Sequence, residues 1–403
     1  MTATIEPPAH KPTPAARLLD KAYFYSLIPL FVLRLLTSLP LKLASPTNPL
    51  HWRQTLALTY LQSQRSTFPA AQITANLRRT PTGEGIRRYC RRHGIAYKSI
   101  TLPPNSSTPQ TTLHSVTPPS PPPSSPSHSP SSPPTLLYFH GGGYVNPLRA
   151  TAHMPFVLSC AAACSAREVL FLEYGLAPEH RYPTQLAQAV AALRYLFVER
   201  GLRADEIVMA GDSAGAHLVG SVLGHLVRGC EGVEGLGLGE GEGFRACLFV
   251  SPFTTMWGGD GGNGKKGGDY LDWGQVGRFM EAWEPREGEV WADLCKGVGG
   301  REVWERVFPG RKDGGRGGLV KKAMVAVGTA EVFLESCREF ASECVRAETV
   351  VAGRKTDWAV LDAVDFVLVE CKGEAHVQPA LDAAVGYQGG VMMRAILRWL
   401  ASV

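Results

Sequence analysis

A serine between two glycines is the first pattern in this sequence that could carry out covalent chemistry. An apolar strand pattern ends at this point and an apolar helical pattern begins, which predicts a tight turn between strand and helix. Such a turn strains the serine backbone and leaves room only for glycine two residues before and two residues after the serine. It would hold the serine hydroxyl out as a nucleophile beside a helix N-terminus that favours negative charge. The residues of the turn are Gly211, Asp212, Ser213, Ala214 and Gly215.

A glycine loop upstream could stabilise the negative charge that such a nucleophile creates. His140, Gly141, Gly142 and Gly143 follow the apolar strand pattern at 136–139. In acyl transfer the carbonyl oxygen becomes an oxyanion, and glycines let a loop direct bare N–H groups at it without steric conflict. Alone, three glycines indicate only a flexible loop. Combined with the serine turn downstream, they predict the anion-stabilising part of a hydrolytic site.

The general base is expected after the last strand, because partners in such sites follow the order serine, acid, histidine. His376 lies in a loop between the predicted strand 366–370 and the closing helical pattern 390–400. From there it can reach back over the sheet to accept the proton of Ser213. Three other histidines fit less well, one in a Pro/Ser segment and two on the helix behind the serine: His128, His217 and His225.

A carboxylate is expected at the end of an intervening strand. Glu331 stands three residues after Gly328, at the carboxyl end of the predicted strand 324–328, where open α/β sheets place functional groups. There it can accept the imidazole N–H and stabilise the imidazolium. Glu335, one helical turn later, is the alternative acid. The sequence therefore predicts a Ser-His-Glu triad.

Three ordered segments resemble the signatures of the hormone-sensitive-lipase-like α/β-hydrolases. They are HGGG at 140–143, EYGLAPEHRYP at 173–183 and GDSAG at 211–215, and the likeness extends from about Tyr97 to the C-terminus. The resemblance implies an esterase that forms an acyl-enzyme and requires no metal or organic cofactor. The apolar N-terminal segment and the residues around Glu331 are most similar to the fungal steryl-acetyl-hydrolase-like branch.

The resemblance also implies residue roles. It assigns the oxyanion-hole N–H groups to Gly142, Gly143 and Ala214. Relatives usually carry Asp where this chain has Glu331, so the acid is a departure from the family pattern.

Strand-like runs alternate with helical ones through the chain, which predicts βαβ units. We expect a three-layer α/β sandwich over 46–403, with a mainly parallel eight-stranded sheet, capped by N-terminal helices and part of 256–318. The segment 103–134 is dominated by Pro and Ser, which predicts a solvated, extended insertion. Two Gly-rich insertions, 230–243 and 258–268, predict surface loops.

The N-terminus affects the expected localisation. Residues 1–21 are rich in Pro, Ala and charge and read as a disordered tail. Residues 22–39, within the apolar segment 22–45, approach the length of a bilayer-spanning helix and predict a membrane anchor. Pro29 and Arg34 favour instead an amphipathic or buried helix over the active site. The expected localisation is membrane-associated, with the endoplasmic reticulum as one candidate, or cytoplasmic.

The amino-acid composition restricts the kinds of partner and metal that the protein is expected to bind. A net charge of +5 over 403 residues, spread among acidic groups, argues against a nucleic-acid partner. Nine cysteines without C-x-x-C spacing argue against zinc and for buried thiols, while disulfides and oligomeric state stay open.

We expect a small or lipid-like apolar ester as substrate. An amidase or lactonase would share the machinery, and a catalytically dead ligand-binding protein is the rival from another class. Aromatic residues of the cap could line an acyl or alcohol pocket or pack on one another: Trp257, Tyr270, Trp273, Phe279 and Trp283.

Overall fold

A computed structural model describes residues 14–69, 79–105, 108–119, 132–255, 268–309 and 318–403. Some of the expectations fall on residues that the structure does not describe. These are residues 1–13, the middle of the Pro/Ser-rich segment, Trp257 and nearly all of the segment 258–268.

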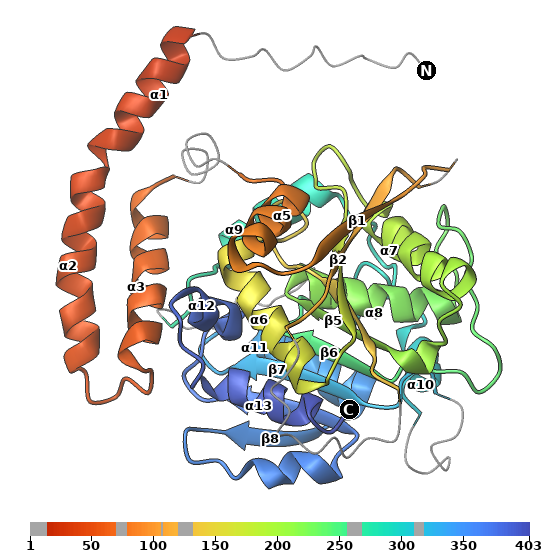
Figure 1. Ribbon diagram of the computed structural model, residues 1–403. Coiled ribbons are helices and arrows are strands. Elements are labelled where there is room, and N and C mark those ends of the chain that lie inside the picture. Colours follow the sequence, from red (N-terminus) through yellow and green to blue (C-terminus); the bar gives the residue numbers. More distant parts are fainter. Residues whose placement is uncertain (1–13, 70–78, 106–107, 120–131, 256–267, 310–317) are drawn as a thin grey trace.

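A single mixed sheet organises the chain (Figure 1). Its strand order is β1-β2-β4-β3-β5-β6-β7-β9-β8, with β1–β2 and β2–β4 antiparallel and all other pairs parallel. The expected α/β sandwich with a mainly parallel sheet is confirmed, but the sheet has nine strands rather than eight. The strands are β1 Tyr97–Leu102, β2 Thr111–Val116, β3 Thr135–Phe139, β4 Glu168–Glu173, β5 Ile207–Asp212, β6 Ala246–Val250, β7 Ala323–Gly328, β8 Glu348–Ala352 and β9 Phe366–Cys371.

Strand β2 corrects the expectation of a solvated loop at 103–134. Its residues lie within that segment but pair with β1 on one side and with β4 on the other. Leu113 and Val116 are fully buried, and the His114 Nε2 atom lies 2.8 Å from the Glu173 carboxylate. The surrounding prolines concealed a short run of β-branched and apolar residues that can alternate between the two faces of a sheet.

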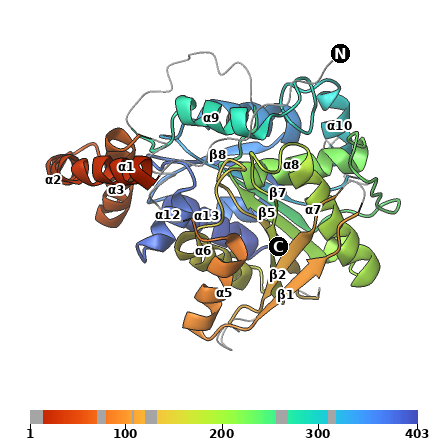
Figure 2. The ribbon, with the colours of Figure 1, turned by 90° about the horizontal axis from the view of Figure 1, so that it is seen from above.

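Helices cover both faces of the sheet, because side chains alternate along each central strand. Leu137 and Met209 pack on the face covered by α7, α8 and α10, whereas Leu136 and Val208 pack on the face covered by α5, α6 and α13. Helix α9 lies across the carboxyl ends of the strands (Figure 2). These helices are α5 Thr82–His93, α6 Ala150–Ala163, α7 Thr184–Arg194, α8 Ala214–Val227, α9 Trp273–Trp283, α10 Gly300–Val307, α11 Leu334–Glu339, α12 Gln378–Ala384 and α13 Val391–Leu400.

Short helical turns complete the layers, namely η1 Tyr195–Glu199, η2 Ala204–Glu206, η4 Phe340–Val345 and η5 Trp358–Ala363. All nine cysteines carry free thiols, and all except the half-buried Cys295 are buried.

Three N-terminal helices stand beside the main body, with α2 alongside α3 (Figure 1). They are α1 Pro14–Ser26, α2 Ile28–Ala44 and α3 Trp52–Thr67, so the expected disordered tail is wrong for residues 14–21. The stretch Leu18–Ala44 is long and apolar enough to cross a membrane, and its apolar core is not buried. A signal sequence would meet the same criteria.

The alternative of an apolar helix covering the active site is wrong for α1 and α2. Two pockets lie beside Ser213, and α3 lines the larger of them, but among the described residues no residue of α1 or α2 lines either pocket. In the sequence alone, the charge of Arg34 argues against a membrane anchor. In the structure its guanidinium donates hydrogen bonds to the Ser66 carbonyl and to the Thr67 hydroxyl at the end of α3. The charged end of the Arg34 side chain therefore lies at the end of α3.

If β2 belongs to the core, Leu113→Ala should lower the free energy of unfolding by about 2–5 kcal/mol, because it leaves a cavity in a close-packed layer. Denaturant unfolding followed by tryptophan fluorescence measures this. Thr112→Ala, at a half-buried neighbouring position, is the matched control and should change stability by less than about 1 kcal/mol. Equal small effects of the two substitutions would show that β2 contributes nothing to the core.

Candidate active site

Ser213 stands at the junction between β5 and α8. Its backbone is in a strained conformation with φ 53° and ψ −119°, and its N–H donates to the Val250 carbonyl at 2.9 Å. The glycines on either side have no space for a side chain. A Cβ atom on Gly211 would lie 2.4 Å from backbone of Gly215, and one on Gly215 would lie 2.0 Å from the Phe139 carbonyl oxygen.

The buried carboxylate of Asp212 ties the glycine loop to this junction. It accepts hydrogen bonds from the Gly141 N–H at 2.9 Å and from the Tyr138 hydroxyl, and lies 3.4 Å from His153 Nε2. Burial alone would raise the pKa of Asp212, but His153, Tyr138 and Gly141 together hold this pKa below its usual value. Asp212 therefore acts as a charged anchor between two loops.

The glycine loop borders the space in front of Ser213. Gly142 and Gly143 have φ values of 125° and 63°, which favour glycine. In the described part of the chain their N–H groups have no hydrogen-bond partner, and both residues line the same cavity as Ser213. Ala214, at the first position of α8, lines the inner pocket on the other side of the serine.

His140 supports the loop from behind. Its ring stacks on Tyr174 at 4.4 Å between centroids, and the Tyr174 hydroxyl donates to the His140 carbonyl at 2.6 Å. Burial lowers the pKa of His140 to about 4, so the ring stays neutral at physiological pH.

The structure brings Ser213, His376 and Glu331 into one hydrogen-bonded row. The Ser213 hydroxyl lies 2.9 Å from His376 Nε2, and His376 Nδ1 donates to the Glu331 carboxylate at 2.8 Å. All three residues are buried. Glu335 is not part of the row, because its exposed side chain forms an ion pair with Arg338.

Glu331 is held in place by its own partners. One carboxylate oxygen accepts from the Gly328 N–H at 2.5 Å and from the Ser251 hydroxyl at 3.1 Å. Ser251 in turn accepts from the Val377 N–H at 3.0 Å, so it links the acid to the histidine loop. Burial raises the pKa of Glu331, and the neighbouring His376 only partly offsets this rise. Burial alone would lower the pKa of His376, but the Glu331 carboxylate outweighs burial and raises it.

Sequence reasoning missed a second carboxylate that positions the site. Asp269 accepts hydrogen bonds from the N–H groups of Tyr270 at 2.7 Å, Val332 at 3.0 Å and His376 at 3.3 Å. It therefore joins the segment before α9 to the loops of the acid and the base. Asp269 follows a Gly-rich stretch without any recognisable motif, so the sequence contains no signal that could have found it.

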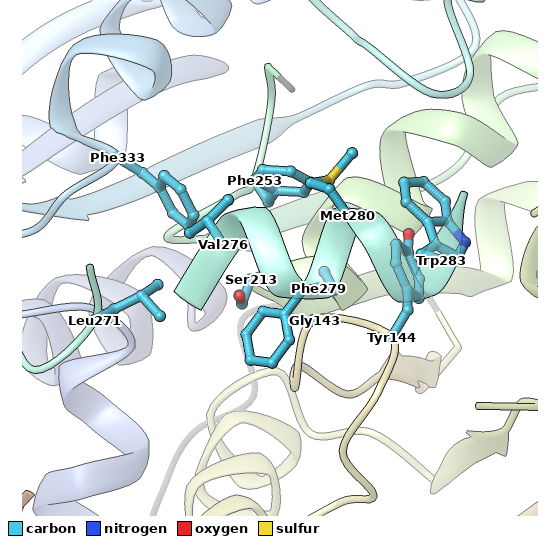
Figure 3. Close-up of a pocket in the computed structure, with 11 residues that line it drawn as sticks. Gly143, Tyr144, Ser213, Phe253, Leu271, Val276, Phe279, Met280, Trp283 and Phe333 are labelled. Carbon is cyan, nitrogen blue, oxygen red and sulfur yellow. The ribbon is translucent and has the colours of Figure 1, made fainter. Parts of the chain in front are cut away.

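A small apolar inner pocket, with a cavity volume of about 20 Å³, begins at Ser213 (Figure 3). Of the aromatic residues expected in the cap, Phe279 and Trp283 line it. Trp273 does not, and instead packs edge-on against Phe333 at 5.7 Å. The lining residues are Gly143, Tyr144, Ser213, Ala214, Phe253, Leu271, Val276, Phe279, Met280, Trp283 and Phe333.

A wider outer chamber opens on the other side of the serine. Its walls come from α3, the start of α6, α9 and α12, and Ser213 and His376 both contact it. Tyr270 lines this chamber, with its ring 6.1 Å from the ring of His376. The site therefore has an apolar inner compartment and a wider outer compartment with both apolar and charged walls, and the two meet at the serine hydroxyl.

The chain is similar to known esterases over part of its length. It is 40% identical over 90 residues to an acetyl-hydrolase of Streptomyces hygroscopicus, covering 22% of this chain and 29% of the relative. It is 37% identical over 98 residues to carboxylesterase NlhH of Mycobacterium tuberculosis, covering 24% of this chain and 30% of the relative. The matches thus span less than a third of either relative.

A solved structure shares the fold. Carboxyl esterase 2 of the mycorrhizal fungus Tuber melanosporum aligns with a TM-score of 0.55 at 16% identity, over 76% of this chain and 86% of that chain. The family profile described as alpha/beta hydrolase fold matches residues 136–357, which include the glycine loop and the serine turn. The expected relationship to the hormone-sensitive-lipase-like α/β-hydrolases is confirmed, while the fungal steryl-acetyl-hydrolase-like branch stays a prediction. Because the profile covers more than half of the sequence, this chain belongs to the α/β-hydrolase fold family.

Proposed function

We propose that this protein hydrolyses carboxylic esters with Ser213 as nucleophile, His376 as general base and Glu331 as the acid that orients the base. The observation that carries the proposal is the unbroken row from the serine hydroxyl through the imidazole to the carboxylate, with distances of 2.9 and 2.8 Å. The names of the acetyl-hydrolase and carboxylesterase relatives support the reaction class.

In the first half-reaction the Ser213 oxygen adds to the carbonyl carbon of the ester while its proton passes to His376 Nε2. The carbonyl oxygen becomes an oxyanion, for which the N–H groups of Gly142, Gly143 and Ala214 are the proposed donors. The intermediate then collapses, and the alcohol leaves with the proton from His376. Ser213 remains as an acyl ester.

In the second half-reaction a water molecule donates a proton to His376 Nε2 and adds to the acyl carbon. The C–O bond to Ser213 breaks, the serine regains the proton, and the carboxylic acid departs. Glu331 accepts the Nδ1 hydrogen bond throughout and stabilises the imidazolium that forms twice per turnover.

The inner pocket supports a small apolar acyl group, because its cavity is small and its lining is mostly aromatic and aliphatic. An amidase or lactonase would use the same residues. The rival of a catalytically dead binding protein is disfavoured by a serine hydroxyl within hydrogen-bond distance of a buried, oriented histidine.

We also propose that α1 and α2 attach the protein to a membrane. Their side chains are exposed although they are largely apolar, for example Leu18 at 70%, Leu36 at 67% and Leu41 at 74%. A large exposed apolar surface on two consecutive helices is unusual for a soluble protein. Helix α2 carries two charges, and both are hydrogen-bonded to α3: Arg34 to the end of that helix and Lys42 to the Gln62 side chain.

Ser213→Ala should reduce ester hydrolysis to background and abolish labelling by a fluorophosphonate, because it removes only the nucleophile. Turnover of p-nitrophenyl esters and gel detection of the label measure this, and circular dichroism checks the fold. Ser342→Ala, at an exposed serine away from the pockets, should label normally. Wild-type protein that neither labels nor hydrolyses any ester would favour the binding-protein rival.

Glu331→Gln should lower kcat by about 10²–10⁴-fold with measurable residual activity, because serine, histidine and glycine loop remain. Glu331→Asp should be milder if the backbone lets the shorter side chain reach His376. The carboxylate raises the pKa of His376, so wild-type kcat/KM should fall on acidification with a midpoint above about 6.5, the ordinary histidine value. In Glu331→Gln this midpoint should move to lower pH.

Glu335→Gln is the matched control for the acid, because that side chain is 81% exposed. It should leave both the turnover and the pH midpoint close to the wild-type values. A large loss of turnover in Glu335→Gln, together with normal turnover in Glu331→Gln, would contradict the assignment of Glu331 as the triad acid.

Removal of residues 1–45 should move the protein from the carbonate-washed membrane pellet to the soluble fraction, while hydrolysis of short soluble esters persists. Leu33→Glu combined with Leu36→Glu, at positions 58% and 67% exposed, should act in the same direction without a deletion. Val351→Glu, at an exposed valine of β8, is the control and should stay in the pellet. Full-length protein that is soluble after the wash would refute the anchor.

A further inference from the structure

The outer chamber is unusually rich in arginine. Four arginines line it, from α3, the segment before α5, the start of α6, and α9: Arg65, Arg79, Arg149 and Arg278. Only two acidic residues share the lining, Asp212 and Asp272. The described walls of the chamber therefore carry an excess of positive charge beside the proposed catalytic serine.

The nearby carboxylates already have other partners. Asp212 is held by the Gly141 N–H, the Tyr138 hydroxyl and His153. Asp272 accepts from the Gln275 N–H at 2.8 Å as the N-cap of α9. Asp269, just outside the chamber, accepts from three backbone N–H groups. None of these carboxylates forms a hydrogen bond with an arginine in the described part of the chain.

Arg65 lies near the reaction centre, beside Tyr270. Its guanidinium carbon is 5.0 Å from the centroid of the Tyr270 ring, and that ring lies 6.1 Å from the ring of His376. Burial lowers the pKa of Arg65 and the charge of Arg149 adds to this shift, whereas Tyr270, Asp272 and Asp269 oppose it without reversing it. Arg149 also acts on Tyr270, so the two guanidinium groups share one neighbourhood.

Arg65 is half-buried and differs from other partly buried arginines of the protein, whereas Arg149 and Arg278 are exposed. Arg338 donates with two nitrogens to Glu370 at 2.7 and 2.6 Å, and Arg200 donates to Glu168 at 2.7 Å. Within the described residues, the guanidinium groups of Arg65, Arg149 and Arg278 form no hydrogen bond or ion pair. A partly desolvated cation without an anionic partner is unfavourable, and a bound anion would remove that cost.

We infer that the outer chamber binds a carboxylate or phosphate group on the alcohol portion of the ester, with Arg65 and Arg149 as its principal ligands. The inference rests on the proposed esterase function and names its substrate class. The guanidinium fork matches both anions with paired hydrogen bonds.

The arrangement of the compartments assigns the anion to the alcohol side. The inner pocket is small and apolar and suits a short acyl group such as acetyl, and the two compartments meet at Ser213. With the acyl group in the inner pocket, the leaving alcohol extends into the arginine-lined chamber. The substrate would then be apolar at one end and negatively charged at the other.

Three acetate esters of similar size test this: 4-acetoxybenzoate, 4-acetoxyphenyl phosphate and the neutral 4-acetoxybenzamide. Rates are divided by those with free imidazole, which removes differences in leaving-group reactivity. Wild-type kcat/KM should favour one or both anionic esters by about 10- to 100-fold, the effect of one or two charge-assisted hydrogen bonds. The favoured ester identifies the anion. Added salt should weaken the preference.

Arg149→Gln should reduce this preference to less than about threefold, and so should Arg65→Gln. Arg149 is exposed, so its variant tests the inference even if Arg65→Gln impairs folding. Arg92→Gln, at an exposed arginine of α5 outside the chamber, is the matched control and should retain the preference. Wild-type protein that hydrolyses the neutral ester as well as both anionic esters would overturn the inference while leaving the esterase proposal intact.

Calorimetric titration of Ser213→Ala with 4-acetoxybenzoate, 4-acetoxyphenyl phosphate and 4-acetoxybenzamide separates the two proposals. Tighter binding of either anionic ester, lost in Ser213→Ala combined with Arg149→Gln, supports the anion site even if wild-type protein hydrolyses nothing. Equal binding or no binding of the three compounds, together with no hydrolysis, would overturn both proposals.

Discussion

The close approach of helix α8 to strand β3 is the constraint on which the rest of the site depends. Gly215 brings the helix so near to β3 that any side chain there would collide with the Phe139 carbonyl. This contact holds Ser213 at a positive φ and aims its hydroxyl at the histidine loop. It also sets Asp212 against Gly141, so the nucleophile turn and the glycine loop are positioned as one unit.

Buried carboxylates position the histidine loop. Ser251 connects Glu331 to the backbone of Val377, next to His376. Two residues before the histidine, Glu374 accepts from the N–H groups that begin α13, at 2.6 and 2.7 Å, and from the Gln54 side chain of α3 at 3.0 Å. Since charged hydrogen bonds in a buried setting are strong and directional, these contacts restrict the loop to one arrangement.

The same contacts explain how α3 serves two purposes. One end of α3 is joined to the histidine loop through Gln54, while Leu61 and Arg65 line the outer chamber. On its other side α3 packs against α2, where the rings of Phe31 and Tyr60 meet edge-on at 5.4 Å. Helix α3 therefore contacts both the exposed apolar helices and the outer chamber.

The sequence alone determined the α/β fold class, the turn around Ser213 and the glycine loop, because these depend on local periodicity and on glycine requirements within a few residues. It also ordered the candidates for serine, acid and base along the chain. Only the tertiary structure shows that Glu331 is buried against His376 while Glu335 is exposed, because packing between distant segments sets both environments. Strand β2 and Asp269 depended on partners far away in the sequence, and no local pattern encodes such partners.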